Sequence, residues 1–374
     1  MTEKRASLRF WLITAVSLGL LLGGIGFTAA RFVVKSELDY FAARFLLLNS
    51  LRKEALESYF DTVRAEITFW SLNQDLLSKQ ADLGSQWKAY RDAGRGADAR
   101  LDYNSFTGAS QAELNALARL FVTERGYYDF FLIGAQGDVL YTVAKEADLE
   151  TNLISGPWRD TGLAEVYRGA VQAAEAPEVV FSDFVSYAPS AGEPAMFAAI
   201  AMRDADEQVL GVLALQLPTD RIRDIMQFTA GMGETGETYL VGEDLLMRSD
   251  SRFSEDSTIL RTRVDTESVR RALGGETGTL FAADYRGENV LSAYTATQIG
   301  EFRWAVMAEI DEQEVLQTMA GKRPAIAGLV LALYALAMWS VWYIRAGKWS
   351  GDRALADLGH IVARISRPTE VSPP

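Results

Sequence analysis

Cysteine is absent from this chain of 374 residues, and histidine occurs only once, at His360. Without cysteine the protein has no disulfide, no thiol nucleophile and no thiolate metal ligand. A single histidine also excludes the histidine clusters that zinc hydrolases use. The sequence contains no recognisable nucleophile–base pair, so we expect a protein that is not an enzyme and that carries neither metal nor cofactor.

Charged residues are absent from two apolar stretches, residues 10–30 and 324–344. About 20 helical residues cross the hydrocarbon core of a bilayer, so both stretches are predicted to be transmembrane helices. Thr28-Ala29-Ala30 loosely resembles a signal-peptidase site. However, the first stretch is longer than the roughly 7–15 apolar residues of a signal peptide, which favours an uncleaved anchor.

Positive charge flanks both stretches, while the acidic residues gather between them. Residues 1–31 carry four Lys or Arg against one acid, and residues 324–374 carry five against three, although the whole chain has a net charge of −13. Short positive flanks stay in the cytoplasm. We therefore expect a protein of the bacterial inner membrane with both termini cytoplasmic and an acidic periplasmic domain, which does not suit nucleic-acid binding.

Proline and glycine are both missing from residues 31–83, where apolar residues recur at steps of three and four. This spacing predicts a long stalk helix over residues 31–90. The predicted organisation is then a cytoplasmic N-terminus at 1–9, the stalk, a membrane-distal module at 91–230, a membrane-proximal module at 231–320, and a short cytoplasmic tail at 345–374.

A strand–turn–strand pattern occurs twice, over residues 128–143 and again over residues 239–248. In both places a helix and further strands follow, and an apolar strand near the end of each module leads into another helix. We interpret this as an internal duplication of an α+β module with an antiparallel sheet, each copy about 100 residues long.

Three stretches resemble a known family: Gly156-Pro-Trp-Arg-Asp-Thr-Gly-Leu-Ala164, Phe181-Ser-Asp-Phe184 with Tyr187-Ala-Pro-Ser190, and Gly233-Glu-Thr-Gly-Glu-Thr-Tyr-Leu-Val-Gly242. With this order of elements, residues 33–319 resemble a double Cache sensor domain, closest to the sensory regions of methyl-accepting chemotaxis proteins. The resemblance implies two PAS-like modules on a long N-terminal helix. It also implies a small ligand in the membrane-distal module and a terminal helix that moves when the ligand binds.

Amino-acid-sensing members of that family carry an Arg-x-Trp-Tyr string and a later Asp that pairs with the ligand amine. Here the corresponding string is Gly156-Pro-Trp-Arg-Asp160, with Trp before Arg and no Tyr after it. Asp183 stands where the amine-binding Asp would be. The ligand class is therefore left open among amino acids, organic acids and similar small solutes.

The residues expected to line the ligand pocket combine apolar walls with a few fixed charges, as pockets for small polar solutes do. An arginine can clamp a carboxylate with two hydrogen bonds, and an aspartate can bind an amine or another cation. The alternative is that the aromatic residues belong to the core and that Arg159–Asp160 is a surface pair. The expected ligand contacts are Tyr141, Trp158, Arg159, Asp183, Tyr187 and Phe197.

Two further motifs have other interpretations. Gly231-Met-Gly-Glu-Thr-Gly236 fits G-x-G-x-x-G but is expected to follow a helix and precede a strand, the reverse of a dinucleotide site. The cluster of Arg248, Asp250 and Arg252 is consistent with an anion site, and a structural salt bridge is favoured.

The function expected from these observations is a transmembrane chemosensory receptor, or its sensory half, acting as a homodimer. One alternative is the sensory region of a receptor cyclase or histidine kinase. Another is a non-sensing accessory membrane protein that uses a Cache scaffold, which the short tail would suit. Ser366-Arg-Pro368 resembles the start of a HAMP linker and favours a receptor.

Overall fold

The computed structural model describes residues 2–92, 109–173, 177–320, 324–325 and 327–344. The chain forms two compact units, residues 1–41 with 315–374, and residues 42–314. His360 and the 366–368 string lie outside the described residues. The units are taken one at a time below.

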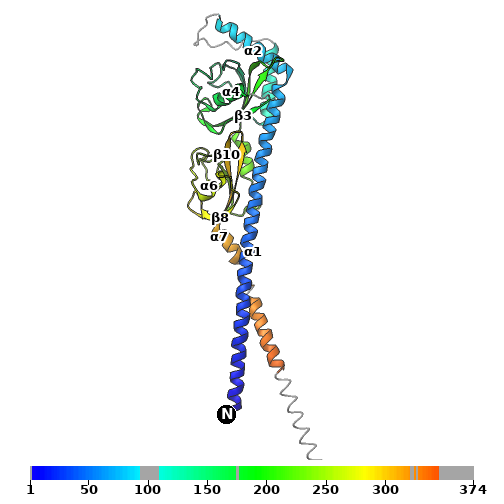
Figure 1. Ribbon diagram of the computed structural model, residues 1–374, viewed down its shortest axis with the longest axis vertical. Coiled ribbons are helices and arrows are strands. Elements are labelled where there is room, and N and C mark those ends of the chain that lie inside the picture. The colour runs from blue at the N-terminus through cyan, green and yellow to red at the C-terminus, as the bar shows by residue number, and fades with distance from the viewer. Residues whose placement is uncertain (1, 93–108, 174–176, 321–323, 326, 345–374) are drawn as a thin grey trace, which may run out of the picture. The chain divides into compact units, whose positions relative to one another are not determined.

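The first helix, α1, runs without interruption over Thr2–Ser71 (Figure 1). The expected single stalk helix is divided, because α2 begins separately at Gln74 and extends to Asp92. Asn73 lies between them, and its side-chain oxygen accepts a hydrogen bond from the backbone N–H of Leu76 at 3.0 Å. Asparagine is a favoured N-cap because it satisfies a donor that the first turn leaves free, so it starts a new helix here.

The first module, residues 109–217, is built on one antiparallel sheet. Its strands run in the order β2-β1-β6-β5-β3, with β4 added on β5. Helix α4 covers one face of the sheet, while α1 and α3 cover the other. The elements are α3 (Ala109–Arg125), β1 (Asp129–Gly134), β2 (Val139–Thr142), α4 (Gly162–Gln172), β3 (Val179–Phe181), β4 (Val185–Tyr187), a short 3₁₀ turn (Ala188–Ser190), β5 (Glu193–Arg203) and β6 (Val209–Leu217).

The second module, residues 237–311, is a smaller sheet in the order β7-β10-β9-β8. Helix α5 (Thr219–Met226) connects the two modules. The second strand expected at 245–248 contributes only isolated bridges, from Met247 to Val241 and from Leu246 to Arg263. The remaining elements are β7 (Glu237–Val241), α6 (Glu267–Leu273), β8 (Gly278–Ala283), β9 (Asn289–Ile299), β10 (Phe302–Asp311) and α7 (Glu312–Ala320).

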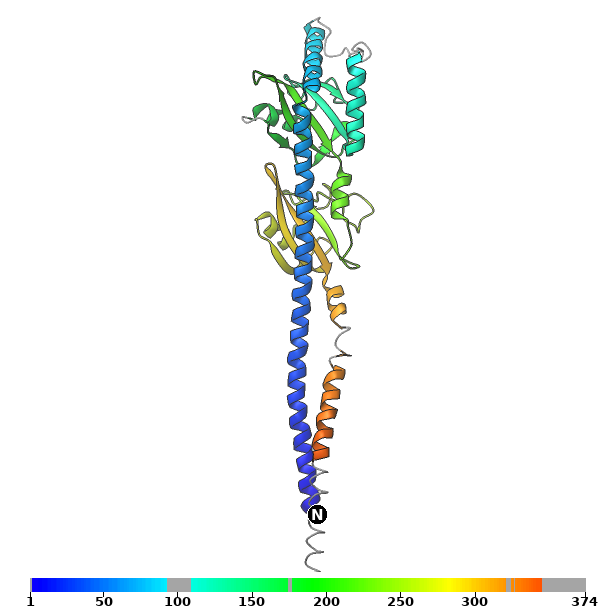
Figure 2. The ribbon, with the colours of Figure 1, turned by 90° about the vertical axis from the view of Figure 1, so that its right-hand side faces the viewer.

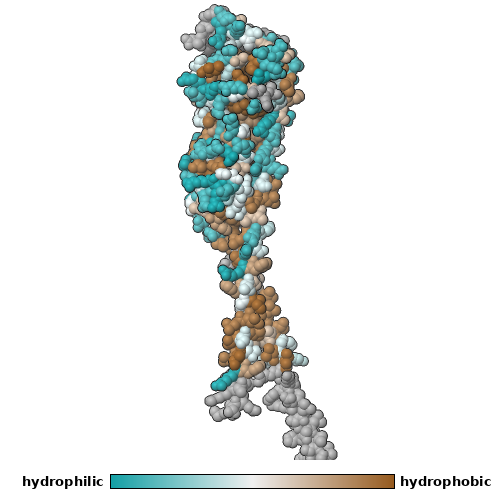
Figure 3. Space-filling model, in the orientation of Figure 1, coloured by the Kyte–Doolittle hydropathy of each residue, from teal (hydrophilic) through white to brown (hydrophobic). Residues whose placement is uncertain are grey.

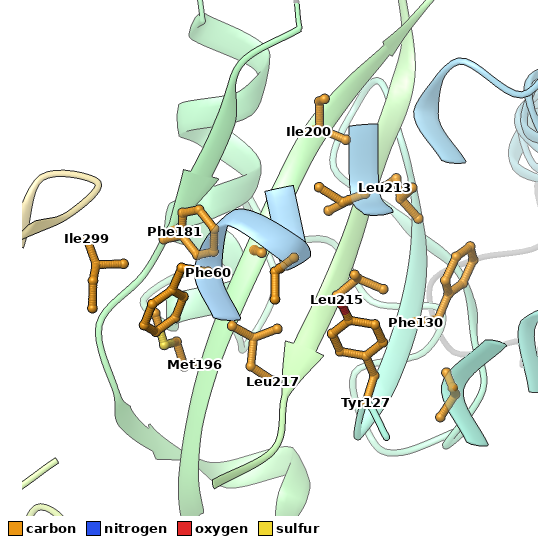
Figure 4. Packing of buried hydrophobic residues seen from close by; sticks show 14 of the residues in the cluster. Phe60, Tyr127, Phe130, Phe181, Met196, Ile200, Leu213, Leu215, Leu217 and Ile299 are labelled. Carbon is orange, nitrogen blue, oxygen red and sulfur yellow. The ribbon is translucent and has the colours of Figure 1, made fainter. Parts of the chain in front are cut away.

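One apolar core joins α1 to both sheets, which lie one after the other along this helix (Figure 2). Leu56, Phe60, Val63 and Ile67 form the buried stripe of α1, at the spacing of one helical face. Figure 4 shows Phe60 among side chains of the first module, beside Phe181. Since Trp304 of β10 also contacts Phe60, a displacement of α1 would be felt in both modules.

Strands β1, β6 and β5 of the first sheet correspond to β7, β10 and β9 of the second, and the correspondence extends to single positions. In the first module Asp129, Gln216 and Phe197 lie opposite one another across β1, β6 and β5. In the second module Glu237, Glu309 and Ser292 lie opposite one another across β7, β10 and β9. The predicted α+β duplication on a long N-terminal helix is therefore confirmed, and each copy places polar residues in the same row of its sheet.

The other unit contains the two candidate membrane spans. Two helices, within Arg9–Ser71 and at Ala327–Ile344, are long and apolar enough to cross a bilayer. Figure 3 shows their apolar side chains gathered at the surface. Within this unit the hydroxyl of Tyr334 donates to the backbone oxygen of Ala15 at 3.3 Å, so the two helices contact each other.

Candidate ligand-binding site

A buried polar cluster lies on the α4 face of the first sheet. Side chains alternate between faces along a strand, and Phe131 and Ile133 of β1 pack in the core on the α4 side. Asp129 has the same parity, and so do Gln216 in β6 and Phe197 in β5, which lie opposite it. This face therefore brings a carboxylate, an amide and an aromatic ring into one row.

Asp148 completes the cluster from the segment that follows β2. Its side chain is fully buried, and Oδ2 accepts a hydrogen bond from the hydroxyl of Tyr187 at 2.5 Å. Oδ1 has no hydrogen-bond partner within the described residues. Burial raises the pKa of Asp148, and burial together with this carboxylate raises the pKa of Tyr187. The backbone N–H groups of Asp148 and Leu149 oppose the rise of the Asp148 pKa, and Oδ1 is left without a hydrogen bond of normal geometry among the described residues.

Glu146, which acts electrostatically on Asp148, is joined to Gln216 by a chain of hydrogen bonds. The hydroxyls of Tyr128 and Ser190 donate to the two oxygens of Glu146, at 2.8 and 2.6 Å. Ser190 Oγ in turn accepts from Gln216 Nε2 at 3.3 Å. Gln216 is only 3% exposed, yet its Oε1 has no partner in the described chain. A second unsatisfied acceptor therefore lies at the same end of the sheet.

Asp129 differs from these residues because its carboxylate is fully engaged. It accepts hydrogen bonds from the backbone N–H groups of Phe130, Val143 and Ala144 and from the hydroxyl of Thr142. Burial raises the pKa of Asp129 to about 6, although the hydrogen bonds oppose that shift. Its role is to hold β1 against the end of β2 and to add negative potential to the cluster.

Three of the six expected ligand contacts lie in the same part of the first module as Asp148. The ring of Tyr187 meets that of Phe197 edge to face, with centroids 4.9 Å apart. Trp158 Nε1 donates to the backbone oxygen of Ala147, next to Asp148, at 3.1 Å. Tyr187 therefore bonds Asp148 directly, while Phe197 packs on Tyr187 and Trp158 bonds the residue that precedes Asp148.

Two other expected contacts lie elsewhere in the module. Tyr141 is fully buried on the opposite face, against Phe130 in the core that α1 shares, and its hydroxyl has no partner among the described residues. Arg159 is exposed and pairs with Asp160 at 3.5 Å. The structure does not bring either residue to Asp148, and their contact with a ligand stays a prediction.

Asp183 joins the two modules. Arg248 of the second module donates to both of its oxygens at 2.9 Å, and Trp304 Nε1 donates to Oδ1 at 2.9 Å. The ring of Trp304 also stacks on Phe184, with centroids 5.9 Å apart. Arg248 therefore takes the structural salt-bridge role favoured from the sequence, and Asp183 is engaged away from Asp148. Its expected contact with a ligand stays a prediction.

Sequence reasoning missed Glu146, Asp148 and Gln216. The alternation of β6 could have placed Gln216 on one face of the sheet, but nothing in the sequence indicates that the segment after β2 folds Asp148 over that face. No group of three or more His, Asp or Glu residues within the described ranges is arranged to hold a metal ion. Hydrogen bonding and charge are therefore the chemistry that this cluster offers.

Comparison with known proteins identifies the family. The family model described as Cache domain matches residues 42–319. No curated protein matches the sequence. Similar solved structures include the periplasmic sensory domain of the Campylobacter jejuni chemoreceptor Tlp1, at 13% identity and a TM-score of 0.48, covering 75% of this chain and 98% of that one.

Two further structures are similar over most of their length. The ligand-binding domain of the Pseudomonas fluorescens chemoreceptor CtaA, solved with L-leucine, has 12% identity and a TM-score of 0.45, covering 77% of this chain and 99% of that one. The ligand-binding domain of the Pseudomonas aeruginosa amino-acid chemoreceptor PctC, solved with GABA, has 15% identity and a TM-score of 0.43, covering 73% and 98%. All three TM-scores are below 0.5, so the assignment rests on the family model. The chain belongs to the Cache domain family.

Proposed function

We propose that this protein is a transmembrane chemosensory receptor, or the sensory half of one, which binds a small solute in its first module. The observation that carries the proposal is the buried, incompletely hydrogen-bonded cluster at Asp148, walled by Trp158, Tyr187 and Phe197. A buried acceptor without a partner is costly, so a ligand that supplies a donor has a favourable place to bind. We assign no catalytic step to the chain.

The proposed topology follows from the charge flanks and the candidate spans. Both spans cross the bacterial inner membrane, both termini are cytoplasmic, and residues between the spans are periplasmic. The first module is then distal to the membrane and the second proximal. The second module is placed to pass a signal on, because β10 ends at Asp311 and α7 begins at Glu312 on the way to the second span.

Signalling would be a shift between two arrangements of the modules, driven by a ligand that binds one arrangement better. The route between the modules is the ion pair of Asp183 with Arg248 and the hydrogen bond from Trp304 Nε1 to Asp183. Asp183 follows directly on Ser182, whose hydroxyl accepts from the backbone N–H of Phe197. A change at the aromatic wall therefore has a short covalent and hydrogen-bonded path to the second module.

We further propose that the receptor is a homodimer that uses the outer face of α1. Leu47, Leu51 and Phe69 are large apolar residues that α1 leaves exposed, and Leu72 follows directly after this helix. Small residues such as Ala55 and Ala65 lie between them on that face. A helix face of this kind lets a second helix approach closely. Cross-linking of a cysteine introduced at Ala65 tests this pairing, since the chain has no native cysteine.

A ligand screen on the full-length chain in lipid nanodiscs tests the sensing function. Thermal unfolding is followed with amino acids, organic acids, purines and amines at 1 mM or more. A ligand at 100 times its Kd stabilises the native state by about 2.7 kcal/mol, which raises the midpoint measurably. We expect at least one class to do so, and Trp158→Ala to remove the shift. The absence of any shift across all classes would contradict the proposal.

A further inference from the structure

The two unsatisfied acceptors of the first module set a chemical requirement for whatever binds there. Asp148 Oδ1 and Gln216 Oε1 are buried oxygens, and neither can donate. The nearby hydroxyl groups are already committed, since Tyr187 donates to Asp148 and Ser190 donates to Glu146. A ligand that satisfies this site must therefore bring N–H or O–H donors of its own.

The charged groups around Asp148 further limit which ligands can bind there. The carboxylate groups that act electrostatically on Asp148 and Tyr187 include Glu146, and Asp129 also acts on Tyr187. No lysine or arginine in the described part of the chain forms an ion pair with Asp129, Glu146 or Asp148. Among the described residues the three carboxylates have no ion-paired cation, so the negative potential of the cluster disfavours a ligand carboxylate and attracts a positive charge.

The walls of the site suit a cation as well. Tyr187 and Phe197 lie edge to face, and Trp158 packs beside the same segment. Aromatic faces attract ammonium groups through their quadrupole, most strongly where water is excluded. An acidic floor with aromatic walls therefore favours a cationic group with an apolar stem.

The corresponding row of the second module shows that an acidic row need not bind anything. There, Glu237 accepts from Ser251 and Tyr285, and Glu309 accepts from Ser292 and Tyr239, so that all four carboxylate oxygens are satisfied. The unsatisfied acceptors in the first module are therefore not a general property of this fold position.

We propose that the first module binds a protonated alkylamine that carries no carboxylate, with its ammonium group donating to Asp148 Oδ1 and Gln216 Oε1. This inference rests on the proposed function, because it names the ligand class of the same site. It differs from binding of an α-amino acid, whose carboxylate would need a cationic partner that the cluster does not supply.

A matched series of probes tests the ligand class on the full-length chain in nanodiscs. The series is n-pentylamine, 5-aminopentanoate and pentanoate, which share a stem and differ only in their charged ends. We expect pentylamine to bind by calorimetry, 5-aminopentanoate to bind at least about tenfold more weakly, and pentanoate not to bind. Equal or tighter binding of either carboxylate, or no binding of pentylamine, overturns the inference.

Variants assign the binding to the site. Asp148→Asn keeps the shape and an acceptor for Tyr187 but removes the charge, and a charged hydrogen bond accounts for about a tenfold or larger change in Kd. Glu309→Gln, at the matching row of the second module, is the control and should leave Kd unchanged. Tyr187→Phe is a second site variant that should also weaken binding. An unchanged Kd in both site variants contradicts the inference.

The same experiments separate this inference from the proposed function. If amino acids or organic acids stabilise the chain and pentylamine does not, the receptor function stands and the alkylamine class is wrong. If no compound of any class stabilises it, the sensing function itself fails.

Discussion

The two modules share the order of three adjacent strands and a row of buried polar residues, yet they differ in how far the hydrogen bonds at that end of the sheet are completed. In the second module the paired Glu237 and Glu309 are both fully hydrogen bonded. In the first module Asp148 and Gln216 each keep an oxygen without a partner. The second module's row is therefore satisfied within the protein, whereas in the first module Gln216 of the row and the neighbouring Asp148 keep the unsatisfied oxygens that we propose a ligand binds. Satisfaction of hydrogen bonds, rather than the presence of acidic residues, distinguishes the two.

The largest expected effect comes from removing the glutamate that completes the second row. Glu309→Ala leaves the hydroxyls of Ser292 and Tyr239 without an acceptor in the core, so we expect unfolding to become easier by about 3 kcal/mol. The matching Gln216→Ala in the first module should cost only about 1 kcal/mol, because one of its polar groups is already unsatisfied. Denaturant unfolding of both variants measures the difference. Equal losses would remove the distinction between the rows.

The ion pair between the modules, Arg248 with Asp183, should give the next largest effect on the free energy of unfolding. Arg248→Ala removes two hydrogen bonds from Asp183, and we expect a loss of about 2 kcal/mol because Asp183 keeps the donor of Trp304 and some contact with water. Arg159→Ala is the control, since the exposed pair with Asp160 should contribute under about 1 kcal/mol. Both are measured by denaturant unfolding. If Arg248→Ala loses no more unfolding free energy than Arg159→Ala, the ion pair of Asp183 with Arg248 contributes little to stability.

The stability of the second module should depend on pH in a defined direction, through Glu309. Burial raises the pKa of Glu309 to about 7 from an ordinary value of 4.5, so between these values the native state holds a proton that the unfolded chain releases. The stabilising contribution of Glu309 to the free energy of unfolding is therefore fully present below pH 4.5. It is lost as pH rises toward 7, by about 1.4 kcal/mol per pH unit.

Glu309→Gln isolates this contribution. The unfolding free energy of the native chain and of the variant is measured from pH 4.5 to 7.5, and we expect their difference to change with pH across that window. Asp284, Tyr285, Arg286 and Asp311 also lie near this row and are the same in both proteins. A difference that does not vary with pH would contradict the account of Glu309.

The smallest effect tests what the two modules have in common. Thr161 caps α4 by accepting from the backbone N–H of Ala164, and Thr266 caps α6 by accepting from that of Val269, both at 3.4 Å. Each Thr→Ala change should cost about 1 kcal/mol. Similar losses would show that the modules share their framework and differ at their polar rows, whereas a clearly unequal pair would show that the frameworks differ too.

The sequence predicted the framework well because its signals are local. Leu56, Phe60, Val63 and Ile67 mark a helix face wherever that helix ends up, and the repeated strand–turn–strand pattern indicated the duplication. The division after Ser71 was missed because Asn73, in a stretch with no proline or glycine, gave the only cue.

The candidate site was harder to predict, for two physical reasons. Strand β1 carries apolar residues on both faces, so the sequence does not tell which face points to α1. Tyr141 of β2 pairs with Leu132 of β1 and shares its face, and for this reason its orientation toward α1 could not be predicted. Asp183 and Arg248 are 65 positions apart, and only the packing of two modules brings them together. Glu146 and Asp148 are placed by a segment without regular secondary structure, for which the sequence offers no periodic signal.

Hydrogen–deuterium exchange of the full-length chain, with and without n-pentylamine, tests the difference between the two rows most directly. The account predicts slower exchange in peptides covering 143–161 and 185–190, around Asp148 and Tyr187, with little direct change around Glu237 and Glu309. Protection centred on Glu237 and Glu309, with none around Asp148, would contradict it.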